Sequence, residues 1–123
     1  MLDLFEACLI GKIMSENKNL FFQLTKNLQN KEAPFISNPD GRTFSYKDMI
    51  NLSGSYSNAL NKLSIKKNDR VLVQAEKQIE CIWLYLACLR IGAIYITINP
   101  NYTISETEYF INDAKPKLIV ITD

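Results

Sequence analysis

The best candidates for chemistry in this chain are two short polar segments. Each one directly follows an apolar run of the kind that forms a buried strand. Ligands of open α/β sheets bind beyond the carboxyl ends of the strands, so these residues could line a crevice for a small molecule. They could equally cap the following helices and face solvent, and isolated polar loop residues favour this second interpretation. The residues are Gln74, Glu76 and Lys77 after the first run, and Asn99, Asn101, Tyr102 and Thr103 after the second.

Phosphate binding is a second chemistry to consider, because closely spaced glycines let backbone amides approach phosphate oxygens. The four glycines of the chain are isolated, and no GxGxxG or Walker pattern occurs. Gly54 lies inside a predicted helix, where close helix packing explains it. Gly92 fits a helix C-cap, which needs a left-handed residue. The glycines therefore indicate structure rather than a nucleotide-binding loop.

Nucleophilic and metal chemistry find little support in the residue types. The chain has no histidine, which is the commonest general base and metal ligand. Its cysteines (Cys8, Cys81 and Cys88) are odd in number and include no CxxC pair, which argues against a disulfide framework and against a zinc site. Cys81 and Cys88 lie two turns apart on an apolar predicted helix and are expected to be small buried hydrophobes. We assign no catalytic, cofactor-binding or metal-binding residue.

Composition describes an ordinary globular chain with no electrostatic specialisation. Of 123 residues, 47% are hydrophobic and 22% are charged, so disorder is not expected. The 14 basic and 13 acidic residues give a net charge of +1, which offers no case for binding nucleic acid or an anionic membrane. Residues 79–98 are long enough to span a membrane, but Glu80, Arg90 and Gly92 interrupt them, so we expect no membrane span.

The first residues of the chain do not resemble a targeting signal. Residues 1–13 are apolar but contain Asp3 and Glu6, and they lack the positive start of a secretory signal. Acidic residues also argue against a mitochondrial presequence. We therefore expect a cytoplasmic protein and treat residues 1–18 as an N-terminal extension without an assigned role.

The first half of the chain predicts a helix, a hairpin and a second helix. Residues 19–28 carry a helical apolar stripe. Residues 33–45 predict a β-hairpin whose turn is the sequence NPDG, with proline at the second position and glycine at the fourth. Ser45 then suits a helix N-cap, with Asp48 three residues later. The helix that follows has one apolar face and one polar face.

The second half alternates strands and helices. Strands are predicted at residues 71–75, 93–98 and 118–122, with a helix at 78–91 that is apolar nearly all round and is therefore packed on both sides. Ser105 and Glu108 are expected to form the capping box of a second, shorter helix that ends at Ala114. This order requires right-handed crossovers, so the fold class is α/β with a parallel sheet in three layers.

Two segments resemble core motifs of adenylate-forming enzymes. Residues 43–49 (TFSYKDM) are similar to the first motif, (T/S)-Y-x-(E/D)-L. Residues 89–100 (LRIGAIYITINP) are similar to the second, L-(K/R)-x-G-x-x-Y-x-P-(L/I)-(N/D), and Asp69 begins the D-x-V part of an expected G-D-x-V segment. The resemblance runs in the family's order from about residue 19 to the end. Asn68 stands where that family has glycine, and Thr97 stands where it has proline.

Within the family, the sequence is most similar to those of malonyl-CoA synthetases. The residues that carry this resemblance are Glu76, Lys77, 84–87 (LYLA), Asn99, Tyr102, Thr103, Glu106 and 109–117 (YFINDAKPK).

The resemblance implies a two-step reaction. A carboxylate attacks the α-phosphate of Mg-ATP, and the thiol of coenzyme A then displaces AMP from the acyl-adenylate. The family's phosphate loop, its aromatic-acidic motif for adenosine and magnesium, its ribose-binding aspartate and its C-terminal lysine do not occur in this sequence. ATP, Mg²⁺ and coenzyme A are thus expected for the full-length family and not for this chain. Whether the chain is itself an enzyme stays open.

Residues 19–123 therefore resemble an incomplete N-terminal subdomain of a carboxylate–CoA ligase for malonate or another small carboxylate. We expect the chain to be inactive alone and to expose apolar surface, through which it meets the remainder of the ligase or associates with itself. One alternative is a non-catalytic α/β module that docks with a separately encoded remainder. Another is an independent small-molecule binder, which would need a closed pocket near Glu76 and Asn99.

Overall fold

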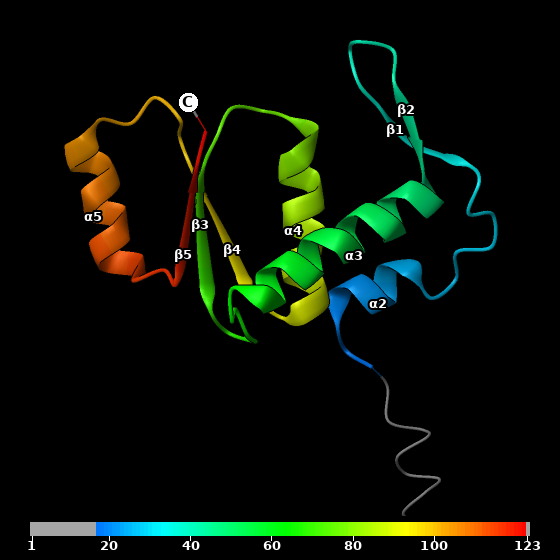
Figure 1. Ribbon diagram of the computed structural model, residues 1–123, viewed down its shortest axis with the longest axis horizontal. Coiled ribbons are helices and arrows are strands. Elements are labelled where there is room, and N and C mark those ends of the chain that lie inside the picture. The colour runs from blue at the N-terminus through cyan, green and yellow to red at the C-terminus, as the bar shows by residue number, and fades with distance from the viewer. Residues whose placement is uncertain (1–16, 123) are drawn as a thin grey trace, which may run out of the picture.

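A computed structural model describes residues 17–122 of the chain. The parallel sheet lies between α5 on one face and α4 on the other, and α3 packs against α4 (Figure 1). This arrangement confirms the predicted three-layer α/β fold. The predicted extension falls almost wholly outside the described residues, as does Cys8. The elements are α2 (Leu20–Thr25), β1 (Pro34–Ser37), β2 (Thr43–Ser45), α3 (Tyr46–Lys62), β3 (Arg70–Gln74), α4 (Ile79–Ile91), β4 (Ile94–Ile98), α5 (Ile104–Ala114) and β5 (Leu118–Ile121).

The parallel sheet has β3 at its centre, with β4 and β5 on either side. The chain moves from β3 to β4 in one direction and from β4 to β5 in the other. Right-handed crossovers then require the two connecting helices to lie on opposite faces of the sheet, as α4 and α5 do. β3 is therefore covered on both sides, and Val71, Leu72 and Val73 are all at most 1% exposed.

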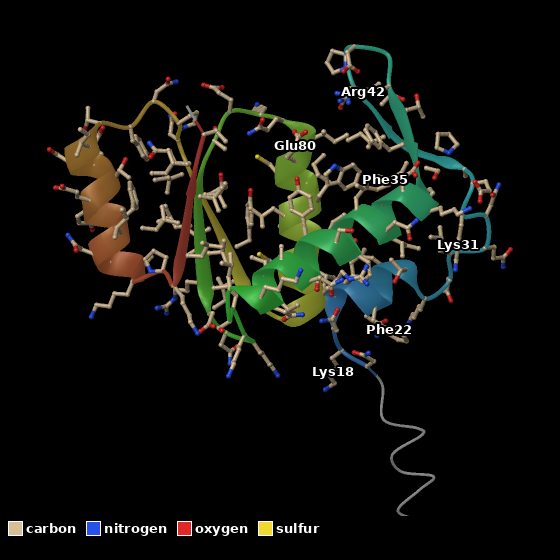
Figure 2. The ribbon with its side chains drawn as sticks, viewed as in Figure 1. Lys18, Phe22, Lys31, Phe35, Arg42 and Glu80 are labelled. Carbon is tan, nitrogen blue, oxygen red and sulfur yellow. The ribbon has the colours of Figure 1, made fainter. Side chains whose placement is uncertain are left out.

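The core is strongest between the sheet and α4. Val71 and Val73 pack with Ala87 and Cys88 of α4 and with Leu60 of α3. The opposite side of α4 contributes a second cluster, in which Trp83 is packed against the hairpin. The rings of Phe35 and Phe44 lie 6.2 and 5.5 Å from that of Trp83, and Figure 2 shows Phe35 directed from the hairpin toward the helices. The prediction that this helix is packed on both sides is confirmed.

Two predicted helix ends are confirmed and one is wrong. Ser45 and Asp48 form a reciprocal capping box, and Gly92 ends α4 with φ of 77°. The capping box of α5 is formed by Thr103 and Glu106 instead of Ser105 and Glu108, so this helix begins at Ile104. Both pairs have the required spacing, but the chain leaves the loop after β4 two residues earlier than the apolar pattern suggested.

The hairpin and the membrane prediction can also be compared with the structure. Gly41 N–H donates to Asn38 O over 3.0 Å, and Gly41 has φ of 88°, which confirms the predicted turn. Between residues 17 and 122, every helix is too short or too polar to cross a bilayer.

Candidate functional site

The carboxyl ends of β3 and β4 form the crevice at which an open α/β sheet offers a ligand site. The two strands pair in register up to Gln74 and Ile98. Beyond that point the chain turns to opposite faces of the sheet, into α4 and α5, and such divergence opens a crevice between neighbouring strands. A hollow of about 570 Å³ lies there, lined by residues 75–77 and 97–100. The structure thus brings Glu76, Lys77 and Asn99 together, as the sequence suggested.

Gln74 does not face this hollow as a free polar group, because it is buried (8% exposed) and its amide is engaged internally. Its Oε1 accepts a hydrogen bond from Thr107 Oγ1 of α5 over 3.4 Å. Its Nε2 lies within 3.3 to 3.4 Å of three backbone oxygens of the loop after β4, those of Asn99, Pro100 and Tyr102. Gln74 therefore ties this loop and α5 to the central strand.

The polar residues after β4 are used in the same way. Asn99 Oδ1 accepts the backbone N–H of Asn101 over 2.9 Å. The Tyr102 ring stacks on that of Phe110 at 5.3 Å. Thr103 caps α5 with Glu106, and the backbone N–H of Thr103 lowers the pKa of the Glu106 carboxyl. Of this group, only Asn99 also lines the hollow.

The chemical groups of the crevice do not form a catalytic set. Glu76 and Lys77 are exposed, and a carboxylate and an ammonium group at a surface can bind a polar molecule but are weak nucleophiles unless a neighbouring group activates them. In the described part of the chain, no group of three or more histidine, cysteine, aspartate or glutamate side chains could hold a metal ion. The described residues therefore offer no cluster of this kind for Mg²⁺, and we derive no catalytic step from them.

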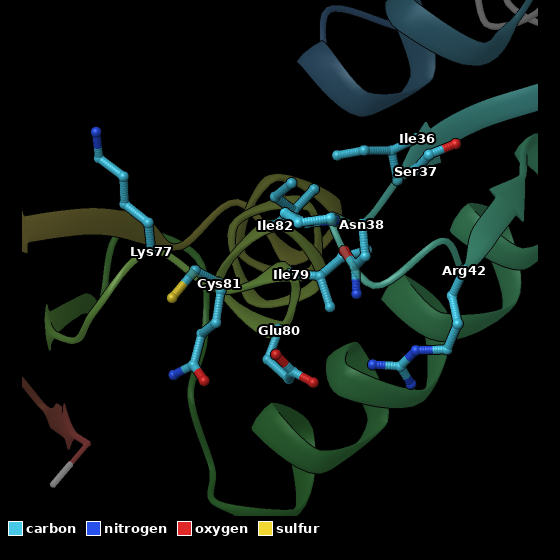
Figure 3. A pocket seen from close by; sticks show the side chains of 11 residues that line it. Ile36, Ser37, Asn38, Arg42, Lys77, Ile79, Glu80, Cys81 and Ile82 are labelled. Atoms are coloured by element: carbon cyan, nitrogen blue, oxygen red, sulfur yellow. The ribbon is translucent and has the colours of Figure 1, made fainter.

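A second hollow, of about 610 Å³, lies between the hairpin and the start of α4 (Figure 3). Ile36, Asn38 and Arg42 line it from the hairpin, and Glu80 and Cys81 line it from α4. Sequence patterns do not indicate this hollow, because the two segments that form it are about 40 residues apart in the chain.

The two described cysteines differ in their surroundings, so only one meets the expectation for a buried hydrophobe. Cys88 is fully buried, and burial raises the pKa of its thiol to about 11. Cys81 is partly exposed, and its Sγ lies 3.6 Å from Glu76 O. The prediction of burial is therefore confirmed for Cys88 and wrong for Cys81, because Cys81 lies in the first turn of α4, at the edge of the hollow beside the hairpin.

The segments that resemble motifs of adenylate-forming enzymes form structural elements and do not line the crevice with catalytic groups. Residues 89–100 form the end of α4, its glycine cap and β4. Asp69 lies at the opposite end of the sheet, where the backbone N–H of Lys66 and the ammonium group of Lys117 lower its pKa. Asn68 has φ of 69°, a left-handed conformation that asparagine tolerates better than most residues. This conformation explains how asparagine can replace a glycine here.

The fold and the crevice define the class of the protein. It is a doubly wound α/β domain, and the segments that resemble family motifs form its helices and strands. The family follows from comparison with known proteins. Residues 23–123 match the family of AMP-binding enzymes, and the chain belongs to this family.

Among curated relatives, the acetyl-coenzyme A synthetase of Thiobacillus denitrificans is 35% identical over 95 residues, which is 76% of this chain and 14% of the synthetase. That of Leptospira biflexa is 31% identical over 116 residues, or 92% of this chain and 18% of the synthetase. The chain therefore spans less than a fifth of the length of these relatives. Among solved structures, MatB from Rhodopseudomonas palustris matches with a TM-score of 0.82 and 36% identity, over 85% of this chain and 21% of MatB.

Proposed function

We propose that the chain is the N-terminal scaffold of an AMP-forming carboxylate–CoA ligase and has no ligase activity alone. The match of residues 23–123 to AMP-binding enzymes, with relatives named as acetyl-coenzyme A synthetases, is the observation that carries this proposal. In the reaction that the resemblance implies, a carboxylate is adenylated with ATP and the adenylate is then captured by coenzyme A. Residues 19–123 would serve to hold the sheet and the β3–β4 crevice in place.

For the substrate we propose a small carboxylate, with malonate first. The resemblance to malonyl-CoA synthetases at Glu76, Lys77 and residues 109–117 supports malonate, and the likeness to acetyl-coenzyme A synthetases keeps acetate as the alternative. The unpaired thiols of Cys81 and Cys88 agree with a reducing compartment, and we propose the cytoplasm.

A domain graft tests the scaffold role. MatB carrying residues 20–121 of this chain in place of its matching segment should still form acyl-CoA. The graft exchanges one structural segment for another of the same fold and leaves the rest of MatB unchanged. A graft that folds, as shown by a cooperative melt, but forms no acyl-CoA from either malonate or acetate would contradict the proposal. The 123-residue chain itself should bind neither ATP nor malonate in a calorimetric titration, and tight binding of either would overturn the proposed inactivity.

A docking module is the second candidate, and a specific surface favours it. Ile94 of β4 pairs with Arg70, and Ile119 and Ile121 of β5 pair with Leu72 and Gln74. All three isoleucines lie on the sheet face toward α5, because the side chains of Arg70 and Gln74 are hydrogen-bonded to α5. The isoleucines remain 43, 38 and 58% exposed, so α5 covers this face incompletely. Apolar side chains left exposed on one sheet face can take part in an interface. Co-purification with a separate adenylate-forming chain would support docking. A stable monomer in light scattering would count against self-association through this face.

A further inference from the structure

The short helix α2 is attached to the domain without a buried residue of its own. It has six residues, and none of them is buried. Leu20, Phe22 and Leu24 are 49, 42 and 64% exposed, and Figure 2 shows Phe22 on the outer side of the helix. A helix of this length is not stable by itself in water, so α2 exists only because other parts of the chain hold it.

The contacts that hold α2 converge on the last turn of α4. Asn19, the N-cap of α2, donates from Nδ2 to Leu89 O over 2.8 Å. Phe21 lies against the guanidinium group of Arg90, whose Cζ is 4.7 Å from the ring centroid. A cation over an aromatic face contributes about 0.5–1 kcal/mol at exposed sites and about 2 kcal/mol when desolvated. Phe21 and Asn19 thus attach α2 to the last turn of α4, and the Phe21 ring also packs against the core cluster that contains Met49 and Leu86.

The orientation of Arg90 is fixed from the other side by α3. Its Nη1 donates to Ile50 O over 2.9 Å and to Ser53 Oγ over 3.2 Å. Gly54 lies beside this group, since a Cβ at that position would be 3.4 Å from Arg90 Nη2, in van der Waals contact with it. The packing that the sequence predicted for Gly54 is therefore packing against one guanidinium group. Lysine could not reproduce this, since it lacks the planar fork that bonds α3 while stacking on Phe21.

Beneath α2 lies a cavity of about 240 Å³ with a mostly apolar wall. Helix α2 and Leu28, three residues beyond its end, form one wall, and the hairpin, α3 and α4 form the other. Displacing α2 would therefore expose apolar side chains without breaking the sheet. The lining residues are Phe21, Leu24, Thr25, Leu28, Phe35, Tyr46, Met49 and Leu86.

We propose that α2 is a strap, docked on α3 and α4 through Arg90, that opens over this cavity while the sheet stays folded. The energies of the few contacts at Asn19 and Phe21 are small beside the burial that stabilises β3 and α4, so opening of the strap is the lower-energy transition. This inference does not rest on the proposed ligase function.

Hydrogen exchange of the full 123-residue chain tests the strap. In Arg90→Met, amides of residues 20–25 should exchange about tenfold faster, as expected for a loss of about 1.4 kcal/mol in local protection. Amides of β3 and α4 should keep their rates. Arg90→Lys should fall between wild type and Arg90→Met, and Arg42→Met, the same change on the hairpin, should leave residues 20–25 unaffected. Asn19→Ala, which does not touch α3, should also accelerate exchange only in α2.

Thiol labelling tests the opening of the cavity. A Met49→Cys substitution places a thiol on the buried wall formed by the hairpin, α3 and α4, and mass spectrometry locates the label. Labelling at position 49 should be about tenfold faster in the Arg90→Met background, while Cys88 stays unlabelled and thereby reports that the core remains closed. The proposal is overturned if exchange in α2 is unchanged in both Arg90→Met and Asn19→Ala, or if α2 and the sheet accelerate together in both. Equal labelling at position 49 in the two backgrounds would likewise overturn it.

Discussion

Replacing Gln74 by methionine should destabilise the domain by about 1.5–4.5 kcal/mol. The Nε2 group has two N–H donors and three backbone oxygens within 3.4 Å, so at most two of those bonds form at once. Oε1 also accepts a bond from Thr107, so methionine removes three bonds, and each neutral hydrogen bond contributes about 0.5–1.5 kcal/mol net, which gives the stated range. Methionine is unbranched and of similar length, so it leaves little cavity to add to this cost.

Urea unfolding of the 123-residue chain, followed by fluorescence, measures this loss directly. Trp83 is the only tryptophan and is 3% exposed, so its emission reports the packing of α4. Gln78→Met is the matched control, since Gln78 is exposed and its side chain makes no cap hydrogen bond. It should change the free energy of unfolding by less than about 0.5 kcal/mol.

A double-mutant cycle with Thr107→Val sharpens the interpretation. The two residues share one hydrogen bond, so their effects should be less than additive. If Gln74→Met were as stable as Gln78→Met, Gln74 would not hold the loop after β4, and its amide would be available to a ligand in the crevice. That result would refute the structural role assigned to it.

Three further predictions concern other positions. Asn68→Ala should cost about 1 kcal/mol in urea unfolding because of the left-handed backbone, whereas Asn68→Gly should be neutral or stabilising. Ser45 lowers the pKa of Asp48 below its ordinary 3.8, so the stabilisation from the ionised cap is present above that pH and is lost as the pH falls through the lower, folded-state value. The stability difference between wild type and Asp48→Asn should therefore shrink on acidification, and a constant difference from neutral to acidic pH would contradict it. Ellman's reagent should modify Cys81 in the folded chain and Cys88 only on unfolding, because a pKa raised from 9.0 to about 11 leaves about a hundredfold less thiolate, and that group is also fully buried.

The elements of the fold could be predicted from sequence where local signals agree. The apolar run of α4, Gly92 as its cap and the β-branched run of β4 are adjacent in the chain, so their order required no knowledge of the rest. The capping box of α5 was misplaced because Thr103 with Glu106 and Ser105 with Glu108 satisfy the same spacing rule. The path of the backbone out of β4 decides between them, and that path is set by Gln74 from another strand.

The remaining features of the fold and the site depend on long-range contacts, which local sequence patterns do not reveal. Gly54 and Arg90 are 36 positions apart, and neither residue type predicts a contact with the other. Gln74 follows buried residues of a strand, a position at which a polar side chain suits a ligand and an internal hydrogen bond equally well. The order of β4, β3 and β5 was likewise undetermined by the sequence, although that order is what places the crevice between β3 and β4.

In this crevice, the position of a ligand site and the side chains that could bind the ligand have different origins. Topology alone creates the place, since neighbouring parallel strands whose connections diverge must leave a gap at their carboxyl ends. Most of the polar side chains predicted to line it make internal contacts with the loop and α5 instead. These are Gln74, Thr103 and the stacked ring of Tyr102. Glu76 and Lys77 stay exposed at its rim. A ligand in this crevice would thus need most of its binding groups from beyond residues 17–122, as expected if this part of an AMP-binding enzyme supplies the frame.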